Sequence, residues 1–169
     1  MKLFKIIFLS IILTLPLFGQ REYTDEVLEQ GLNNIDEFIE FLSYPNDANF
    51  RSDIDKLINW TENKFESLEF KIEKLDTETI PLLLASKHIN DDYKTILIYL
   101  HLDGQPVDLS KWNQENPFIP VFKLNENGNF TNYDSSKLKN ISYDTLEEND
   151  IRIFARSSSD AKGPVMMLI

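Results

Sequence analysis

Two near-continuous apolar runs constrain the fold of this chain more than any other feature. Residues 79–86 read TIPLLLAS, and residues 95–101 read TILIYLH. Strands that are buried on both faces carry such uninterrupted apolar stretches, whereas strands with one solvated face alternate apolar and polar residues. Both runs therefore predict buried strands, and the polar stretch at residues 89–92 predicts a hairpin-like turn between them. Residues 69–75 alternate apolar and charged side chains and predict a strand with one solvated face.

Amphipathic helices are predicted before these strands. Between Thr24 and Leu42 the apolar residues recur at spacings of three and four, and residues 44–46 (YPN) predict the helix end. A second helix is predicted to start at Ser52 or Asp53, with an apolar inner face made of Ile54, Leu57, Ile58, Thr61, Phe65 and Leu68. These stripes are expected to form core.

The second half of the chain is predicted to be less regular. Residues 106–123 hold three prolines and predict irregular structure, while residues 125–150 predict a polar surface excursion with a short hairpin. Residues 151–154 (IRIF) predict a fourth strand, and residues 163–169 (GPVMMLI) predict an apolar helix. Helices followed by strands, with a later strand and helix, are typical of α/β or α+β layers.

Composition excludes several functional classes. The formal net charge of −11 leaves no basic surface for a phosphate backbone, so a nucleic-acid partner is not expected. The chain contains no cysteine, which excludes disulfides, Cys-ligated zinc and thiol catalysis.

The first 20 residues, MKLFKIIFLSIILTLPLFGQ, predict a secretory signal peptide. Lys2 and Lys5 precede an apolar run at residues 6–15, which is shorter than the roughly 20 apolar residues of a membrane-spanning helix. The mature chain, residues 21–169, is expected to be exported to the periplasm or the extracellular space, without stable membrane insertion after cleavage. An uncleaved N-terminal anchor is the alternative.

His101 follows the second apolar run directly, and Asp103 comes two residues later. Ligands of open α/β sheets gather beyond the carboxyl ends of strands, so an imidazole there can hold a metal ion. Metal-bound histidines usually donate their second N–H to a carboxylate or a carbonyl group, a role that suits Asp103. A lone His-x-Asp pair is also common as ordinary surface or core polarity.

A second polar segment follows the predicted strand at residues 151–154. Residues 155–164 read ARSSSDAKGP and place Asp160 just before a predicted helix, where a carboxylate can bridge cations. In the alternative interpretation, the serines and Asp160 only cap this helix.

Together, these segments resemble the M-twenty family of metallopeptidases, which includes dipeptidases, glutamate carboxypeptidases and aminoacylases. The resemblance covers nearly the whole mature chain and looks closest to the dipeptidase branch. It rests on the combination of HLDGQPVD at residues 101–108, KW at 111–112, PFIPV at 117–121 and RSSSDAKGP at 156–164.

This resemblance implies a three-layer α/β/α zinc-exopeptidase catalytic domain, of which residues 21–169 are the N-terminal part. It implies hydrolysis of a peptide, dipeptide or related amide bond at a pair of zinc ions. His101 would bind one zinc, Asp160 would bridge both, and Asp103 would orient His101. The peptide bond after the bridging aspartate, here Asp160–Ala161, is commonly cis in this family.

The family also uses a glutamate base, further ligands and a lid or dimerisation domain, which are expected beyond residue 169 because the sequence ends inside an apolar run. The complete enzyme would then form a homodimer, and the present chain alone is expected to be inactive. Leu100 and Ser157 replace glycines that usually flank the motifs, so the metal pocket is expected to be crowded or its backbone altered, unless they are tolerated variation. An inactive relic or an exported binding module on the same scaffold is the alternative function.

Overall fold

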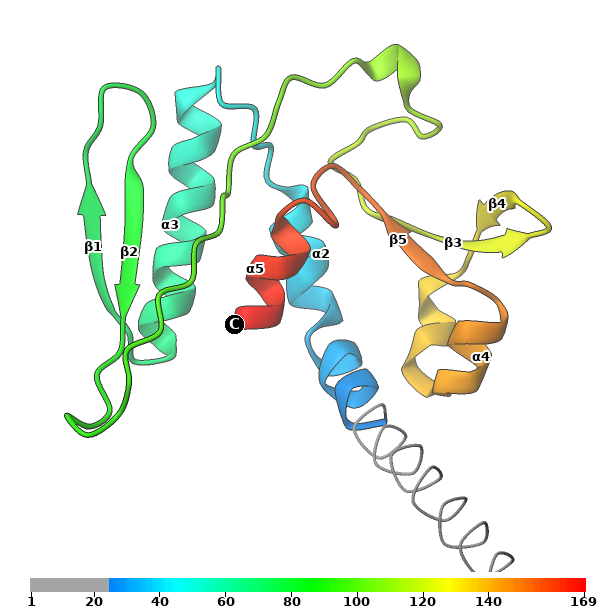
Figure 1. Cartoon of the computed structure of the whole chain (residues 1–169). Helices are drawn as coiled ribbons and strands as arrows, with labels where there is room; N and C mark the ends of the chain where they lie inside the picture. Colours follow the sequence, from blue (N-terminus) through cyan, green and yellow to red (C-terminus); the bar gives the residue numbers. More distant parts are fainter. Residues whose placement is uncertain (1–24) are drawn as a thin grey trace, which may run out of the picture. The chain divides into compact units, whose positions relative to one another are not determined.

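The computed structural model describes residues 25–169 of the chain (Figure 1). These residues form two compact units, one of residues 25–36 and 123–152, the other of residues 37–122 and 153–169. The fold is mixed α/β, with helices and small sheets. No helix within the described range is long and apolar enough to cross a bilayer. The predicted signal peptide at residues 1–20 lies outside the described residues.

Both predicted N-terminal helices are confirmed. Residues 25–33 are helical, and after a turn at Asn34 helix α2 runs Ile35–Ser43. The helix ends before Pro45, because proline disfavours the helical conformation in the residue that precedes it. Helix α3, Arg51–Ser67, begins one residue before Ser52 and two before Asp53, the two predicted starts.

The hydrophobic core of the larger unit joins these helices to the C-terminal helix α5, Lys162–Leu168. Phe41 and Leu57 are fully buried, Val165 is nearly so, and the Phe41 ring stacks on Trp60 with centroids 4.4 Å apart. The predicted inner face of α3 is buried at Ile54, Leu57, Ile58, Thr61 and Phe65. Val27, assigned to the apolar stripe of the first helix, is 68% exposed, so that part of the stripe was wrongly predicted to be core.

The first sheet is an antiparallel pair beside α3, made of β1, Lys71–Leu75, and β2, Leu82–Ser86 (Figure 1). Lys74 of β1 forms an ion pair with Glu62 of α3 at 2.8 Å. The sequence predicts both strands. The prediction that both faces of β2 are buried is wrong, since Leu82 and Leu84 are 57% and 41% exposed. No second layer among the described residues covers that face of the pair.

The predicted buried strand at residues 95–101 is not formed. Residues 94–103 have no regular secondary structure, and Ile96, Leu97 and Tyr99 are exposed. The expected turn is present, since Tyr93 N–H donates to the Asn90 carbonyl, but no described strand pairs with the segment that follows it. An apolar run becomes a strand only where a neighbouring strand supplies partners for its backbone groups, and here that neighbour is missing from the described fold.

The second sheet has the strand order β4-β3-β5. Strands β3, Val121–Glu126, and β4, Asn129–Asn132, form the expected hairpin. Asn127 and Gly128 connect them with φ angles of 54° and 93°, the left-handed conformations that tight hairpin turns require. Strand β5, Arg152–Phe154, confirms the predicted fourth strand.

Short helices complete the irregular regions. The 3₁₀ helix η1, Leu109–Lys111, interrupts the proline-rich stretch, and η2, Ser135–Asn140, and α4, Tyr143–Glu148, follow the hairpin. Residues 125–150 are therefore more regular than the sequence predicted. Their polar side chains cap these short helices, as Ser142 does for α4.

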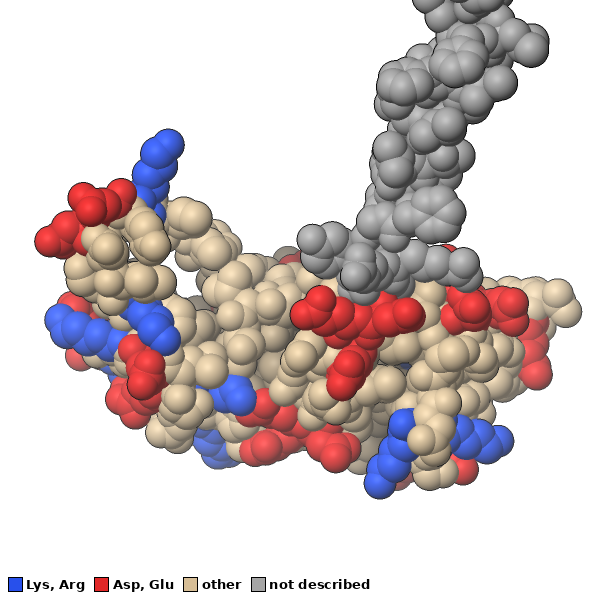
Figure 2. All heavy atoms as spheres, turned by 90° about the horizontal axis from the view of Figure 1, so that it is seen from below, with Lys and Arg blue, Asp and Glu red and all other residues tan. Residues whose placement is uncertain are grey.

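Acidic side chains stand in groups on the face shown in Figure 2, with lysines and arginines between them. On α3, Arg51 and Lys56 pair with Asp55 and Asp53 at 2.8 and 3.0 Å. Part of the basic charge is therefore neutralised locally, and the net charge of −11 gives the surface a negative field overall.

Candidate functional site

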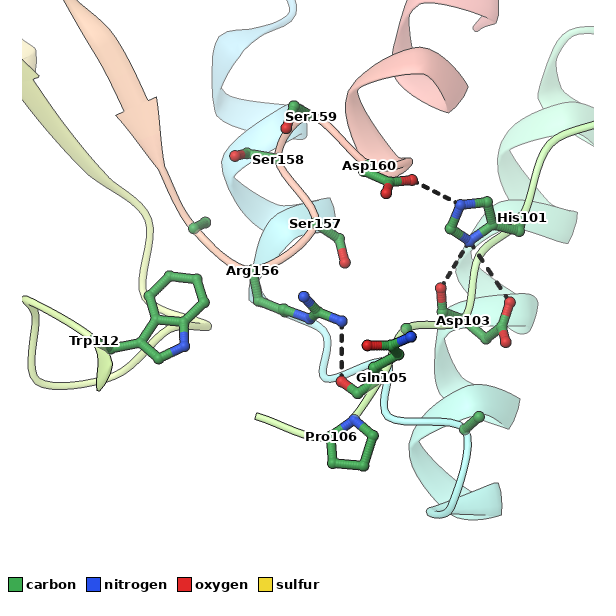
Figure 3. A pocket seen from close by; sticks show the side chains of 13 residues that line it. His101, Asp103, Gln105, Pro106, Trp112, Arg156, Ser157, Ser158, Ser159 and Asp160 are labelled. Atoms are coloured by element: carbon green, nitrogen blue, oxygen red, sulfur yellow. Dashed lines mark hydrogen bonds and ion pairs between the residues drawn. The ribbon is translucent and has the colours of Figure 1, made fainter. Parts of the chain in front are cut away.

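His101 and Asp160, which are 59 positions apart in the sequence, lie in direct contact. His101 Nε2 is 2.8 Å from Asp160 Oδ1. Figure 3 shows the imidazole and the carboxylate facing each other at one end of a pocket of about 610 Å³. The pocket is lined by Ala48, His101, Asp103, Gly104, Gln105, Pro106, Trp112, Ala155, Arg156, Ser157, Ser158, Ser159 and Asp160. The two sequence motifs thus converge on a single cavity within the larger unit.

The chain between α2 and α3 holds the His101 segment in place. Asn46 carbonyl accepts from Gly104 N–H at 2.6 Å, and Ala48 N–H donates to the Gly104 carbonyl at 3.1 Å. These bonds form an isolated parallel bridge between Asp47 and Gly104. A β-carbon on Gly104 would lie 2.9 Å from Arg156 Nη2 and 3.0 Å from Asn46 Nδ2, so any larger residue would require these side chains to shift. The loop after α2, rather than a sheet, supports the residues that follow His101.

The hydrogen bond at Nδ1 fixes the tautomer of His101. Nδ1–H donates to the backbone carbonyl of Asp103 at 2.9 Å, while the Asp103 carboxylate lies 3.7 Å from the same nitrogen. The carbonyl group of Asp103, and not its carboxylate, is therefore the closer partner of His101 Nδ1. The carbonyl bond, followed by the bond to Asp160, raises the pKa of His101 above its ordinary value of 6.5.

Asp160 is an exposed residue at the end of a short loop. Its side chain is 84% exposed, and the Asp160–Ala161 peptide bond is cis, as the resemblance implies. Helix α5 begins at Lys162 with Ala161 as its N-cap and without a side-chain cap. The alternative in which the serines and Asp160 only cap this helix is therefore wrong.

Leu100 and Ser157, which stand where the M-twenty resemblance would place glycines, are accommodated differently. Ser157 adopts φ 65°, the left-handed conformation that glycine favours, and its Oγ accepts from Asn46 Nδ2 at 2.9 Å. Leu100 packs against the hydrophobic core around Phe41. Neither side chain separates His101 from Asp160, so crowding of the pair is not observed.

Lys162 has a structural role that the sequence did not reveal. Its side chain is fully buried, and Nζ donates to the carbonyls of Phe41, Leu42 and Tyr44 at 2.9, 3.4 and 2.5 Å. These carbonyls belong to the C-terminal end of α2, where a cation compensates the unpaired groups and the helix dipole. Burial, and then the nearby charge of Arg156, lowers the pKa of Lys162 to about 7. No local signal distinguishes this lysine from a surface lysine in the sequence.

The donor atoms of the His101–Asp160 pair suit zinc. An imidazole nitrogen with its other N–H bonded to a carbonyl, and a carboxylate oxygen, are both common zinc ligands. Within residues 25–169, no group of three or more His, Cys, Asp or Glu side chains is gathered as a metal site. The described pocket therefore supplies two candidate ligands, one fewer than the protein ligands of a typical catalytic zinc.

Comparisons of this chain with protein families, with curated proteins and with solved structures find no match.

Proposed function

We propose that this chain is the N-terminal part of an exported, zinc-dependent hydrolase that cleaves a peptide, dipeptide or related amide bond. His101 and Asp160 would hold the metal, with Asp160 bridging a pair of zinc ions. The 2.8 Å contact between His101 Nε2 and Asp160 Oδ1, at the wall of a cavity, is the observation that carries this proposal. The residues of the two motifs named for the M-twenty resemblance meet there.

The polar contacts of His101 support a ligand role. Nδ1–H is committed to the Asp103 carbonyl, which leaves Nε2 as the coordinating atom of a neutral imidazole. A proton lies between Nε2 and the Asp160 carboxylate when the imidazole is charged, and a metal ion would replace that proton. Bound zinc would supply Lewis-acid polarisation of the scissile carbonyl group and acidify water.

The remainder of the pocket supports a peptide substrate. Figure 3 shows Trp112 on the side of the pocket away from His101 and Arg156 between them, where Arg156 Nη2 donates to the Gln105 carbonyl at 3.0 Å. Arg156 is the one Lys or Arg among the described residues that line the cavity, and a guanidinium group favours a carboxylate. Trp112 and Pro106 offer apolar surface for the side chain of a peptide.

The proposal extends to the whole enzyme. Its complete catalytic domain would be a three-layer α/β/α sandwich located in the periplasm or outside the cell, and the mature enzyme would form a homodimer. Because two protein ligands are too few for a catalytic zinc, we expect weak zinc binding and no dipeptide hydrolysis by this chain alone. The same ligand deficit favours a second candidate function, a non-catalytic binding module on the same scaffold.

Zinc titration of the 169-residue chain, with His101→Ala and His88→Ala as a matched pair, tests the metal assignment. His88 is an exposed histidine that pairs with Asp91 outside the pocket, so its removal controls for the loss of an imidazole. We expect calorimetric zinc binding that His101→Ala abolishes and His88→Ala retains. Equal binding by all three proteins would contradict the assignment of His101.

Hydrolysis separates the enzyme from the binding module. The coding sequence extended beyond codon 169, expressed as a longer chain, should release amino acids from dipeptides in the presence of zinc. This activity should disappear in the Asp160→Asn variant. A longer chain that binds zinc through His101 but hydrolyses no peptide or amide would favour the binding module.

A further inference from the structure

Asn46 is a buried polar residue that neither motif contains. It follows the end of α2 and is 1% exposed. Its amide nitrogen donates two hydrogen bonds, to the Leu102 carbonyl and to Ser157 Oγ, both at 2.9 Å. An asparagine amide carries two N–H donors, so each donor is committed to one of the two segments that meet in the pocket.

The acceptors determine the orientation of this amide. If its oxygen and nitrogen exchanged places, the oxygen would face the Leu102 carbonyl, and two acceptors would repel each other. In the observed orientation, Asn46 Oδ1 is buried without a hydrogen-bond partner among the described residues. A buried acceptor without a partner is costly, so the side chain is held here by its two donor bonds.

The backbone of Asn46 adds a third connection. Its carbonyl accepts a hydrogen bond from Gly104 N–H at 2.6 Å. Gly104 follows His101 in the sequence, whereas the apolar run precedes His101. Leu102 adjoins His101 in the sequence, and Ser157 lies three residues before Asp160. Asn46 thus forms hydrogen bonds with both segments, and each bonded residue lies at most three sequence positions from His101 or Asp160.

We infer that Asn46 is a positioning residue, which sets the separation of His101 and Asp160 by tying both segments to one buried amide. This inference rests on the proposed function for the role of the pair, but the geometric coupling can be measured without metal. Asn46 does not touch the reacting groups, and its effect is transmitted through Leu102 and Ser157. A purely structural asparagine would change the stability of the chain and leave the pair as it is.

The zinc affinity of Asn46 variants tests this inference. We expect Asn46→Ala and the isosteric Asn46→Asp to weaken zinc binding about tenfold, the usual effect of removing a group that supports a metal ligand. Asn49→Ala is the matched control, because Asn49 is an exposed asparagine in the same loop that bonds only locally to Asp47. Thr61→Ala controls for stability, since it removes a buried hydrogen bond to Leu57 within α3, which belongs to neither motif. Both controls should bind zinc within twofold of the unmodified chain.

Proton NMR reports the same coupling without metal. At pH 6, a His101 Nε2–H signal protected by Asp160 is expected for the unmodified chain and for both controls. This signal should be lost in Asn46→Ala, while circular dichroism shows that the fold persists. If the unmodified chain binds no zinc, the proposed function fails, and this signal alone decides the inference about Asn46.

Ser157→Ala provides a milder version of the test. It becomes the decisive variant in the case that the Asn46 variants do not fold. It removes one of the two amide bonds, and we expect about threefold weaker zinc binding and a less protected Nε2–H signal. In the double variant with Asn46→Ala, no further loss is expected, because both changes break the same connection. The inference would be overturned if zinc affinity and the imidazole signal both stay unchanged in the Asn46 variants. If the Asn46 variants are unfolded, the same unchanged result in Ser157→Ala would overturn it.

Discussion

Residues 95–99 and residues 101–104 are neighbours in one irregular segment, yet they differ in how they contact the rest of the fold. The apolar part is exposed, with Leu97 85% exposed, and no described strand pairs with it. The polar part is bonded on both sides, through His101 to Asp160 and through Gly104 to Asn46. The position of His101 therefore does not depend on strand pairing before it, but on hydrogen bonds to the loop after α2.

The loop after α2 must be rigid for the His101–Asp160 pair to form. The loop after α2 is tied to α5 by Lys162, and α5 directly follows Asp160. Contacts that fix this loop should affect both stability and the pair. Contacts of the apolar segment should affect neither.

Lys162→Met should have the largest effect. Methionine has a similar volume, but it leaves the carbonyls of Phe41, Leu42 and Tyr44 buried without their donor, which we expect to lower the free energy of unfolding by about 3 kcal/mol. The cost of burying an ammonium group opposes this loss, so a more stable variant in urea unfolding would show that desolvation is the larger effect. Lys56→Met, which breaks an exposed pair with Asp53, is the control and should change stability by less than about 1 kcal/mol.

Substitutions of Ser157 separate its hydrogen bond from its backbone conformation. Ser157→Ala loses the bond from Asn46 and keeps φ at 65°, so it should cost about 1 kcal/mol of unfolding free energy. Ser157→Gly loses the same bond but removes the left-handed penalty of about 1 kcal/mol, so it should be nearly neutral. Equal destabilisation of both variants in urea unfolding would mean that the backbone conformation carries no penalty.

The raised pKa of His101 predicts how stability depends on pH. Since the folded-state pKa lies above the ordinary value of 6.5, the folded chain binds more protons than the unfolded chain in this range. The resulting stabilisation is complete below pH 6.5 and is lost as the pH rises through the folded-state pKa. Because the Asp160 side chain is 84% exposed, the effect should stay below about 1 kcal/mol.

Between pH 5.5 and pH 8, the lowered pKa of Lys162, about 7, gives a stability that rises with pH in the unmodified chain and in its histidine variants alike. The effect of His101 should therefore appear as a difference, with the unmodified chain losing more stability, or gaining less, than His101→Gln. His88→Ala, which changes an exposed histidine outside the pocket, should keep the pH dependence of the unmodified chain. An identical pH dependence in His101→Gln would contradict the assigned hydrogen bonds of His101.

The sequence predicted the elements that local patterns specify. The stripe of α3 and the end of α2 before Pro45 follow from side-chain periodicity and from backbone chemistry. The convergence of His101 and Asp160 could be anticipated only through the paired motifs, because their separation of 59 positions leaves no local signal. Asn46 and Lys162 could not be identified as supports, since a buried hydrogen bond between distant segments depends on the completed fold.

The apolar run at residues 95–101 is where sequence reasoning fails, and the reason is physical. Its composition predicts burial, but burial requires a neighbouring strand, and residues 25–169 do not provide one. A composition pattern describes the surroundings that a segment favours and says nothing about whether a partner is present. Substitutions in the apolar segment and substitutions around the His101–Asp160 pair therefore test different contributions to the structure of the pocket.

Leu97→Ser should have the smallest effect. With 85% of Leu97 exposed, the change should alter the free energy of unfolding by less than about 0.5 kcal/mol, whereas Leu57→Ala in the core should cost about 2–5 kcal/mol. Hydrogen exchange should show the same contrast, with unprotected amides at residues 95–99 and protection at Gly104, whose N–H is bonded to Asn46. Protected amides at residues 95–99, or a loss above about 1 kcal/mol in Leu97→Ser, would mean that the apolar segment is paired in solution. The position of His101 would then depend on the apolar segment as well as on the loop after α2.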